Sequence, residues 1–397
     1  MANELTIIAM PNDGVSSPRV SKGCLDSAPF GINLHLAKAA LAHARATDTE
    51  HSFVNMNGET ENLISMQTGP LHQAVKKADK LLGLEVLDLS IREPKPAPHF
   101  KVKSTDGASF IKKSADPHHK NAWQLSDQEN SLTLELHLPQ KHGVTLILEM
   151  CRTEHNDNDH NTDPVIISVN GDEWPLTLDA HHLKFYKQSF YLTHHCLQVG
   201  KNIISLRRAC DVETEVLVKS AAVMRFEIEK QKRSEWCWAA ITTSLLKFFT
   251  PESEITQCEV VRHCFNKTKG FETTKDCCKN SKTDECNRQF KLIDALDFMG
   301  VLSMRCNYPL SLDEIREQIN QGVPVAIRIK WNGGGAHFVM ITAVGPTDPR
   351  GDDFTWLRVS DPNEPTALYK SYKILKKDKR GEWSHSYLFE KERKRHS

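Results

Sequence analysis

Cys237 has the surroundings that a nucleophilic cysteine needs. It lies in the stretch QKRSEWCWAA, at the expected start of a helix for which Ser234 is available as the N-cap. Backbone N–H groups and the helix dipole at such a position stabilise a thiolate, which is the reactive form of cysteine. Gln231 lies six residues upstream. Its side-chain amide could donate a hydrogen bond to an oxyanion that forms beside the Cys237 backbone N–H. The alternative is a small buried apolar cysteine on a helix.

A general base and an orienting acid follow later in the chain. His337 comes after three glycines in WNGGGAHFVMITAV and opens an apolar strand, and Asp361 ends the next apolar strand, FTWLRVSD. If the two strands pair as a hairpin, the Asp361 carboxylate accepts a hydrogen bond from His337 Nδ1–H, which fixes the tautomer and stabilises the imidazolium. The order Gln, Cys, His, Asp predicts acyl transfer at an amide carbonyl.

The same four residues resemble the motif positions of a known superfamily. Gln231, Cys237-Trp238-Ala239, the AHF around His337 and the SDP around Asp361 resemble the papain-like cysteine peptidases over about residues 230–390. The resemblance is closest to the bacterial branch with the plant-pathogen effector proteases and the double-glycine leader peptidases. It implies an oxyanion donor, a nucleophile, a base that then acts as acid, and an orienting residue, in that order. The cathepsin-type sequence CGSCW is absent, and a Cys-rich insertion occupies the middle of the region.

Two other functions stay open. A transglutaminase-like acyl transferase or a glutamine deamidase uses the same Cys-His-Asp order, and release of peptides or of ammonia would separate these enzymes from a peptidase. A binding protein with a vestigial protease domain is the third reading. The intact set Gln231, Cys237, His337 and Asp361 argues against it.

The elements that must position these residues indicate an α+β domain over 230–397. Helical patterns come first and apolar strands later, without alternation, which is typical of α+β folds. The third helix opens with a capping box, Ser311 and Glu314, and ends at Gly322. The expected helices are 236–249, 289–300 and 311–322, and the expected strands are 324–331, 337–344 and 354–361.

A different pattern, with period two, covers residues 100–229. Short alternating strands separated by turn signals predict an all-β sandwich. The pair ISVNG and LQVGKNIISLRR resembles the galactose-binding-like jelly-roll family, which implies a possible glycan or protein ligand for this domain. The expected strands are 132–138, 144–150, 165–171, 189–197, 202–208 and 215–228.

Residues 1–93 are expected to form a small N-terminal α/β or helical module, with helices near 34–46 and 71–83. Three prolines at alternate positions then predict an extended linker over 94–99. The N-terminus has an acidic residue where a signal peptide has basic ones, so we expect a cytoplasmic protein or one exported without a cleavable leader.

The remaining patterns predict no cofactor and no metal. Charged residues are 26% with a net charge of zero, which argues against nucleic acid as a partner, and no apolar run is long enough to span a membrane.

Of eleven cysteines, five crowd into 258–286, where zinc binding, disulfides or buried reduced thiols are all open. A disulfide there would use Cys277 or Cys278, because adjacent cysteines cannot easily bond each other. The loop 155–163 has the alternating oxygen ligands of a calcium loop without its glycine and final glutamate. The expected partner is a protein or peptide substrate.

Overall fold

The computed structural model describes the chain mainly from Leu84 to Phe389, together with the short antiparallel pair β1 (Ser52–Val54) and β2 (Thr60–Asn62). Within that range it leaves out 91, 98, 112–119, 127–129, 153–164, 177–183, 209–214, 251–252, 272, 274, 302, 347, 349 and 365–367. The helices expected near 34–46 and 71–83 and the candidate calcium loop 155–163 lie outside the described residues.

The described chain from Leu84 to Arg225 forms one compact unit, built from two antiparallel sheets. One sheet has the strand order β10-β9-β12-β7-β4, and the other has β11-β8-β13-β6-β5 with β3 also paired to β13. The strands are β3 (Leu84–Asp88), β4 (Phe100–Ser104), β5 (Ser109–Ile111), β6 (Ala122–Leu125), β7 (Ser131–Leu138), β8 (Val144–Arg152), β9 (Val165–Val169), β10 (Asp172–Leu176), β11 (Tyr186–Leu192), β12 (Gly200–Arg208) and β13 (Val216–Met224).

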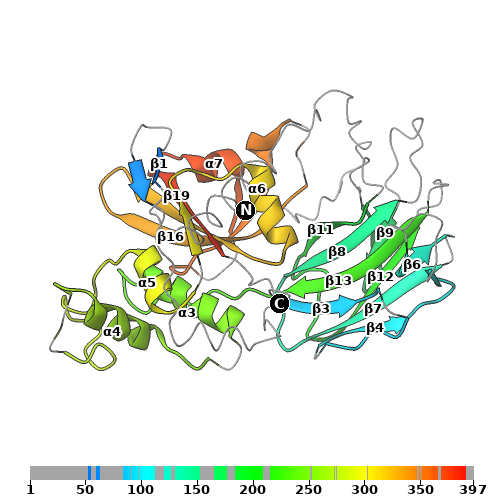
Figure 1. Ribbon diagram of the computed structural model, residues 1–397, viewed down its shortest axis with the longest axis horizontal. Coiled ribbons are helices and arrows are strands. Elements are labelled where there is room, and N and C mark those ends of the chain that lie inside the picture. Colours follow the sequence, from blue (N-terminus) through cyan, green and yellow to red (C-terminus); the bar gives the residue numbers. More distant parts are fainter. Residues whose placement is uncertain are drawn as a thin grey trace. The chain divides into compact units, whose positions relative to one another are not determined.

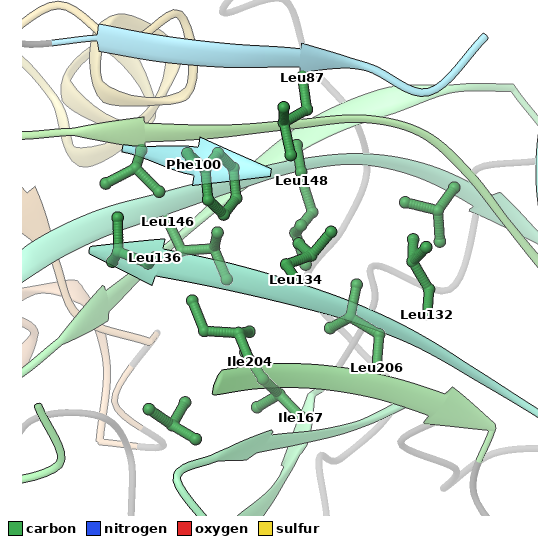
Figure 2. Packing of buried hydrophobic residues seen from close by; sticks show 14 of the residues in the cluster. Leu87, Phe100, Leu132, Leu134, Leu136, Leu146, Leu148, Ile167, Ile204 and Leu206 are labelled. Atoms are coloured by element: carbon green, nitrogen blue, oxygen red, sulfur yellow. The ribbon is translucent and has the colours of Figure 1, made fainter. Parts of the chain in front are cut away.

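One large hydrophobic core joins the two sheets into a sandwich. Leu134 of β7 and Ile204 of β12 pack in one cluster with Leu146 and Leu148 of β8, from the opposite sheet. Figure 2 shows these side chains meeting between the strands. Alternate residues of a strand point to one face, and in β9 and β12 only the residues of one face are buried, as the period-two pattern predicts. Strand β8 is instead buried on nearly every residue. The predicted sandwich is confirmed.

Strand β3 differs from the expected domain plan. It was expected in the N-terminal module, but it pairs with β13, with Leu84 opposite Met224 and Asp88 opposite Ser220. The prolines at 94–98 therefore lie between two strands of the sandwich, β3 and β4, where we expected a linker between domains. The chain LEVLDL reads equally well as the end of the preceding helical pattern, so local periodicity could not separate the two.

The second unit holds the candidate site, in residues Phe226–Ile319 and from Val323 onward. Its antiparallel sheet has the order β14-β19-β15-β16-β17-β18. Helices α3, α4 and α5 pack on one another, and α3 also packs on β16; Figure 1 shows the three grouped beside the sheet. The elements are α3 (Cys237–Phe249), α4 (Gln257–Lys267), α5 (Leu292–Phe298), β14 (Ser303–Cys306), α6 (Leu312–Asn320), β15 (Val325–Trp331), β16 (Ala336–Val344), η2 (Asp352–Phe354), β17 (Trp356–Ser360), β18 (Leu368–Ser371), α7 (Tyr372–Lys376) and β19 (Gly381–Phe389).

The α+β prediction is confirmed, with three helices and three strands close to their expected positions. The Ser311–Glu314 capping box is present, since the Ser311 N–H donates to Glu314 Oε2 at 2.8 Å and the Glu314 N–H donates to Ser311 Oγ at 3.2 Å. Strands β14, β18 and β19 and helix α4 were not predicted. β19 lies inside the sheet, between β14 and β15.

Helix α3 is buried along its whole length except at Lys247. Its three consecutive hydroxyl residues satisfy themselves locally: Thr242, Thr243 and Ser244 each donate to the carbonyl four residues earlier, at 2.7–2.8 Å. A buried hydroxyl without a partner is costly, so this bonding lets a polar run sit inside the core. The helix is thereby fixed as the platform for the residue at its first position, Cys237.

Candidate active site

Cys237 is the first residue of α3, and only 6% of it is exposed. Backbone N–H groups in the first turn of a helix have no intrahelical partner, so they point toward whatever lies at that end. The N-cap is Trp236 rather than the expected Ser234. Ser234 lies a little further upstream, where its hydroxyl accepts a hydrogen bond from Asn287 Nδ2 at 2.9 Å. The prediction of Cys237 at the helix start is confirmed, and that of its cap is wrong.

His337 and Asp361 come together as the expected hairpin requires. β16 pairs with β17 antiparallel, with Met340 opposite Ser360. His337 Nε2 lies 2.7 Å from Asp361 Oδ1, and the two side chains are 16% and 17% exposed. The carboxylate therefore engages Nε2, where we expected Nδ1. This orientation leaves Nδ1 as the ring nitrogen available to the Cys237 thiol.

The charge of His337 is governed by burial and by its two neighbours. Burial lowers its pKa, but hydrogen bonds and charge interactions with Asp361 and Cys237 outweigh burial and raise the pKa to about 9. Burial likewise acts to raise the pKa of Asp361, yet the His337 hydrogen bond and charge, with the Asn363 N–H, hold it below its usual range. The pair is thus arranged to keep an imidazolium beside a carboxylate.

The turn before His337 needs glycine for conformational reasons. Gly334 and Gly335 have φ angles of 93° and 78°, a region that residues with a side chain rarely adopt. A Cβ on Gly334 would meet no atom within 4 Å, so the backbone conformation, and not a lack of space, favours glycine there. The Trp331 ring, at the other end of the turn, stacks parallel to His337 with 15° between the planes and 6.3 Å between the centroids.

The Gln231 backbone bonds to the residue that follows Asp361. Its N–H donates to Pro362 O at 2.7 Å, directly after Asp361. Its side-chain Nε2 donates to Arg233 O at 3.0 Å and to Ser234 O at 2.9 Å, so both amide hydrogens serve the loop that leads to Cys237. An oxyanion role needs one of them to be redirected to substrate. That role stays a prediction.

The two tryptophans that flank Cys237 are anchors of the helix start. Both side chains are fully buried. Trp236 Nε1 donates to Cys286 O at 2.8 Å, and Trp238 Nε1 donates to Arg288 O at 3.1 Å. Each indole satisfies its single donor on the same segment of the Cys-rich insertion.

That insertion contains two disulfides, Cys258–Cys278 and Cys277–Cys286. The adjacent cysteines 277 and 278 thus bond to different partners. Of the three alternatives left open by the sequence, the disulfides are the one that the structure has, and both of the expected cysteines take part. Cysteines in disulfides offer no thiolate to zinc, so four of the five candidate ligands are taken. Among the residues that the structure describes, no group of three or more His, Cys, Asp or Glu could hold a metal ion.

Sequence reasoning missed Asn287, Gln257 and Trp331. Gln257 is fully buried and bonds to the backbone of both residues that flank Gln231. Its Oε1 accepts the Lys232 N–H at 2.9 Å, and its Nε2 donates to Lys230 O at 2.9 Å. An aromatic six residues before the candidate base was a usable signal for Trp331. Asn287 and Gln257 carry no local signal, because only the folded insertion brings them to residues 230–235.

Comparison with solved structures finds carbohydrate-binding modules. One is a CBM36 module in complex with calcium and xylotriose, 12% identical over 35% of this chain and 98% of that one, with a TM-score of 0.24. Others are CBM35 from Cellvibrio japonicus Abf62 (12% identity, 36% and 92% covered, TM-score 0.26) and a family 35 module from Clostridium thermocellum (12%, 35% and 98%, 0.25). A glycan or protein ligand for the sandwich stays a prediction. No curated protein matches the chain.

Comparison with protein families gives one match in the second unit. The family described as Peptidase_C39 like family matches residues 223–387, a range that contains all four candidate site residues. In the described part of the chain, no helix combines the length and apolar character needed to cross a bilayer. The C-terminal region of the chain, 223–387, is therefore similar to cysteine peptidases of the papain-like branch, as the motifs around Cys237 and His337 predicted.

Proposed function

We propose that the C-terminal unit is a cysteine peptidase that cleaves peptide bonds through Cys237, His337 and Asp361. The observation that carries the proposal is the position of His337, which interacts with the half-buried Asp361 carboxylate through Nε2 and with the Cys237 thiol at the start of a buried helix. A thiol, an imidazole and an orienting carboxylate in contact are the parts that nucleophilic catalysis at an acyl carbon needs.

The reaction proceeds in two acyl-transfer steps. Cys237 Sγ, as thiolate, attacks the carbonyl carbon of the scissile amide, and the electron pair of the C=O moves to oxygen. When the C–N bond breaks, the His337 imidazolium gives its proton to the leaving amine. A water molecule then attacks the thioester while His337 takes one of its protons. The C–S bond breaks, and the acid is released with the Cys237 thiolate restored.

The oxyanion of both steps forms next to the start of α3. The Cys237 backbone N–H belongs to the first turn and is one donor for it. Gln231 is the second donor in this proposal, once substrate binding draws one amide hydrogen from the loop carbonyls of Arg233 and Ser234. Asp361 holds the ring through Nε2 and stabilises the imidazolium in the meantime.

The two disulfides favour a protein that works in an oxidising environment, because such bonds do not persist in a reducing cytosol. Of the two expected locations, an exported one therefore fits the insertion better than a cytoplasmic one. Mass spectrometry of alkylated, non-reduced protein purified from its native source tests this point. Free thiols at Cys277 and Cys286 would favour the cytoplasmic alternative.

The decisive experiment for the activity is product identification. The full chain and its Cys237→Ala variant are incubated with a proteome-derived peptide mixture, and mass spectrometry records new peptide termini and released ammonia. New termini that need Cys237 support a peptidase. Ammonia or cross-linked glutamine without new termini would instead support a deamidase or transglutaminase-like enzyme, which shares the acyl-enzyme. No product of either kind, with no labelling of Cys237 by an irreversible thiol probe, would support the vestigial binding protein.

A further inference from the structure

Residues 286–288 of the insertion run alongside the segment that contains the candidate nucleophile. Three consecutive residues of the insertion each bond to the loop and first turn around Cys237. Cys286 O accepts from Trp236 Nε1, and Arg288 O accepts from Trp238 Nε1. Between them, the Asn287 side chain bonds to the loop itself.

Asn287 bonds to two adjacent residues of this loop with both ends of its amide. Its Oδ1 accepts the Glu235 backbone N–H at 3.0 Å, and its Nδ2 donates to Ser234 Oγ at 2.9 Å. Ser234 O in turn accepts from Gln231 Nε2 at 2.9 Å. Asn287 is therefore linked through Ser234 to the candidate oxyanion donor and through Glu235 to the start of α3.

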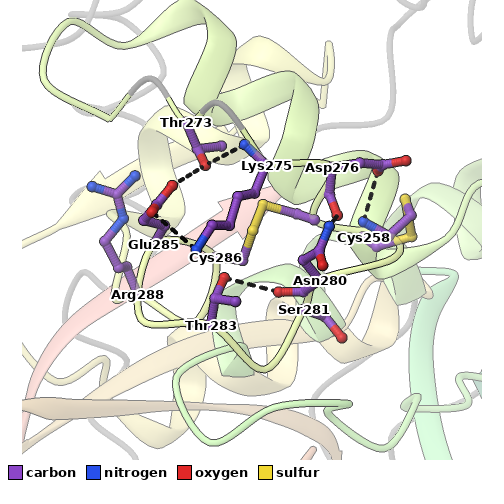
Figure 3. The surroundings of a disulfide bond; sticks show 12 residues. Cys258, Thr273, Lys275, Asp276, Asn280, Ser281, Thr283, Glu285, Cys286 and Arg288 are labelled. Atoms are coloured by element: carbon purple, nitrogen blue, oxygen red, sulfur yellow. Dashed lines mark hydrogen bonds and ion pairs between the residues drawn. A yellow bond between two sulfur atoms is a disulfide. The ribbon is translucent and has the colours of Figure 1, made fainter.

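The insertion is itself braced, so it can act as a fixed support. The Cys277–Cys286 disulfide ends at the residue just before Asn287. Figure 3 shows the loop closed further by Glu285, which accepts from Thr273 Oγ1 at 2.9 Å and pairs with Lys275 Nζ at 3.3 Å. Arg288 lies over the Phe265 and Phe271 rings, at 4.7 and 4.8 Å from their centroids. A side chain on so constrained a segment has little freedom of its own.

We propose that Asn287 is a positioning residue for the reaction: it fixes the Ser234–Glu235 backbone, and through it the Gln231 amide and the first turn that carries Cys237. The proposal rests on the proposed peptidase function. A small displacement of reacting groups is enough to slow an enzyme severely, whereas substrate binding depends on other parts of the cleft. Loss of Asn287 therefore lowers kcat and leaves KM nearly unchanged.

The test compares substitutions within one loop of the full chain. Asn287→Ala removes both hydrogen bonds. Asn287→Asp keeps an acceptor for the Glu235 N–H and offers its second oxygen to the Ser234 hydroxyl, so it should restore most of kcat. The matched control is Asn280→Ala, because the exposed Asn280 side chain bonds only to Asp276 O, inside the insertion. Ser234→Ala removes the same bond from the other side.

For Asn287→Ala we expect kcat to fall by about 10- to 100-fold, with KM and Tm close to those of Asn280→Ala. Combining it with Ser234→Ala should add little, because the two changes remove one shared interaction. The proposal is overturned if Asn287→Ala turns over like Asn280→Ala, if only KM rises, or if the loss of kcat follows a fall in Tm that Asn287→Asp does not restore. If Asn287→Ala does not fold, Ser234→Ala and Asn287→Asp carry the same comparison.

A second readout separates this proposal from the peptidase assignment. The alkylation rate of Cys237 by iodoacetamide, followed on the Cys237 peptide, needs no substrate. If the wild-type chain cleaves no peptide, the proposed function fails, yet slower alkylation in Asn287→Ala than in Asn280→Ala still supports positioning of Cys237. Equal alkylation rates in those two variants would overturn the positioning role.

Discussion

Two opposing effects act on His337, and the charged neighbours prevail. A histidine this buried would ordinarily lose its proton readily, since burial disfavours the charged ring. Asp361 at 2.7 Å and Cys237 favour the imidazolium instead and raise the pKa to about 9. A raised pKa favours the protonated ring at neutral pH, from which the proposed reaction takes the proton for the leaving amine. The types and order of these residues could be predicted from sequence, but the use of Nε2 by Asp361 could not, because ring orientation depends on side-chain packing.

The pH profile should report this arrangement. If the active form is a thiolate beside an imidazolium, kcat/KM should fall as pH rises through about 9, the pKa of His337. Asp361→Asn removes the charge that stabilises the imidazolium, so the pKa falls and the alkaline limb should move to lower pH. The measurement is kcat/KM from pH 5 to 10 in both proteins. An alkaline limb that stays in place after Asp361→Asn would contradict the role of the carboxylate.

Gln231 has a separate expectation. If one of its amide hydrogens reaches the oxyanion, Gln231→Ala should lower kcat by roughly 10²–10³-fold with little change in KM. Steady-state kinetics with a peptide substrate give both constants. A rise in KM alone would mean that Gln231 only positions substrate, in agreement with the loop contacts it makes in this structure.

At the scale of elements, the candidate active site depends on an insertion as much as on α3 and the sheet. The regular elements could be predicted because their patterns are local: period two in β7 and β12, a capping box in α6, and an apolar run in α3. The contacts of the insertion could not be predicted, because they join residues far apart in sequence. The Cys258–Cys278 disulfide spans 20 positions, and the bonds from Asn287 to Glu235 and from Cys286 to Trp236 span 52 and 50. Helix α4 does carry local signals that our interpretation of its cysteines passed over: a capping box of Thr256 and Glu259, and a buried face that includes Val260, Val261, Cys264 and Phe265.

The Cys277–Cys286 bond should support both stability and activity. It closes a short loop, with a sequence separation of 9. In the chain-entropy description such a cross-link contributes about 2–3 kcal/mol to the free energy of unfolding. The double variant Cys277→Ala/Cys286→Ala should lose about that much in urea unfolding. The double variant should also have a lower kcat, because Cys286 O accepts the Trp236 Nε1–H hydrogen bond and the next residue is Asn287. Unchanged kcat in a destabilised variant would separate the insertion from catalysis.

At the scale of the molecule, the boundary between the two units lies slightly earlier than residue 230. The compact second unit begins at Phe226, whose ring packs against Phe248 of α3 at 5.6 Å. Glu229 pairs with Lys247, and its backbone N–H donates to Ser244 Oγ at 2.9 Å. A chain that begins at 230 would lose the contacts of Phe226 and Glu229 with α3. Residue 230 is where the change in sequence pattern alone places the boundary.

Two fragments test this boundary. We expect residues 226–397 to be soluble when expressed alone, to react with a thiol probe at Cys237, and to have a higher Tm than residues 230–397. The reason is that only the longer fragment keeps Phe226 and Glu229 on α3. Insolubility of 226–397, together with solubility of 84–397, would show that the two units depend on each other for folding.

The central claim is that Cys237 and His337 form a reactive pair, and the rate of Cys237 alkylation against pH tests it most directly. The imidazolium next to the sulfur should make Cys237 react with iodoacetamide already at about pH 6, well below the range of an ordinary thiol. His337→Ala should abolish that early reactivity, whereas Asp361→Asn should affect alkylation less than turnover. A rate that rises only above about pH 8, and is the same in wild type and His337→Ala, would identify an ordinary thiol and contradict the account.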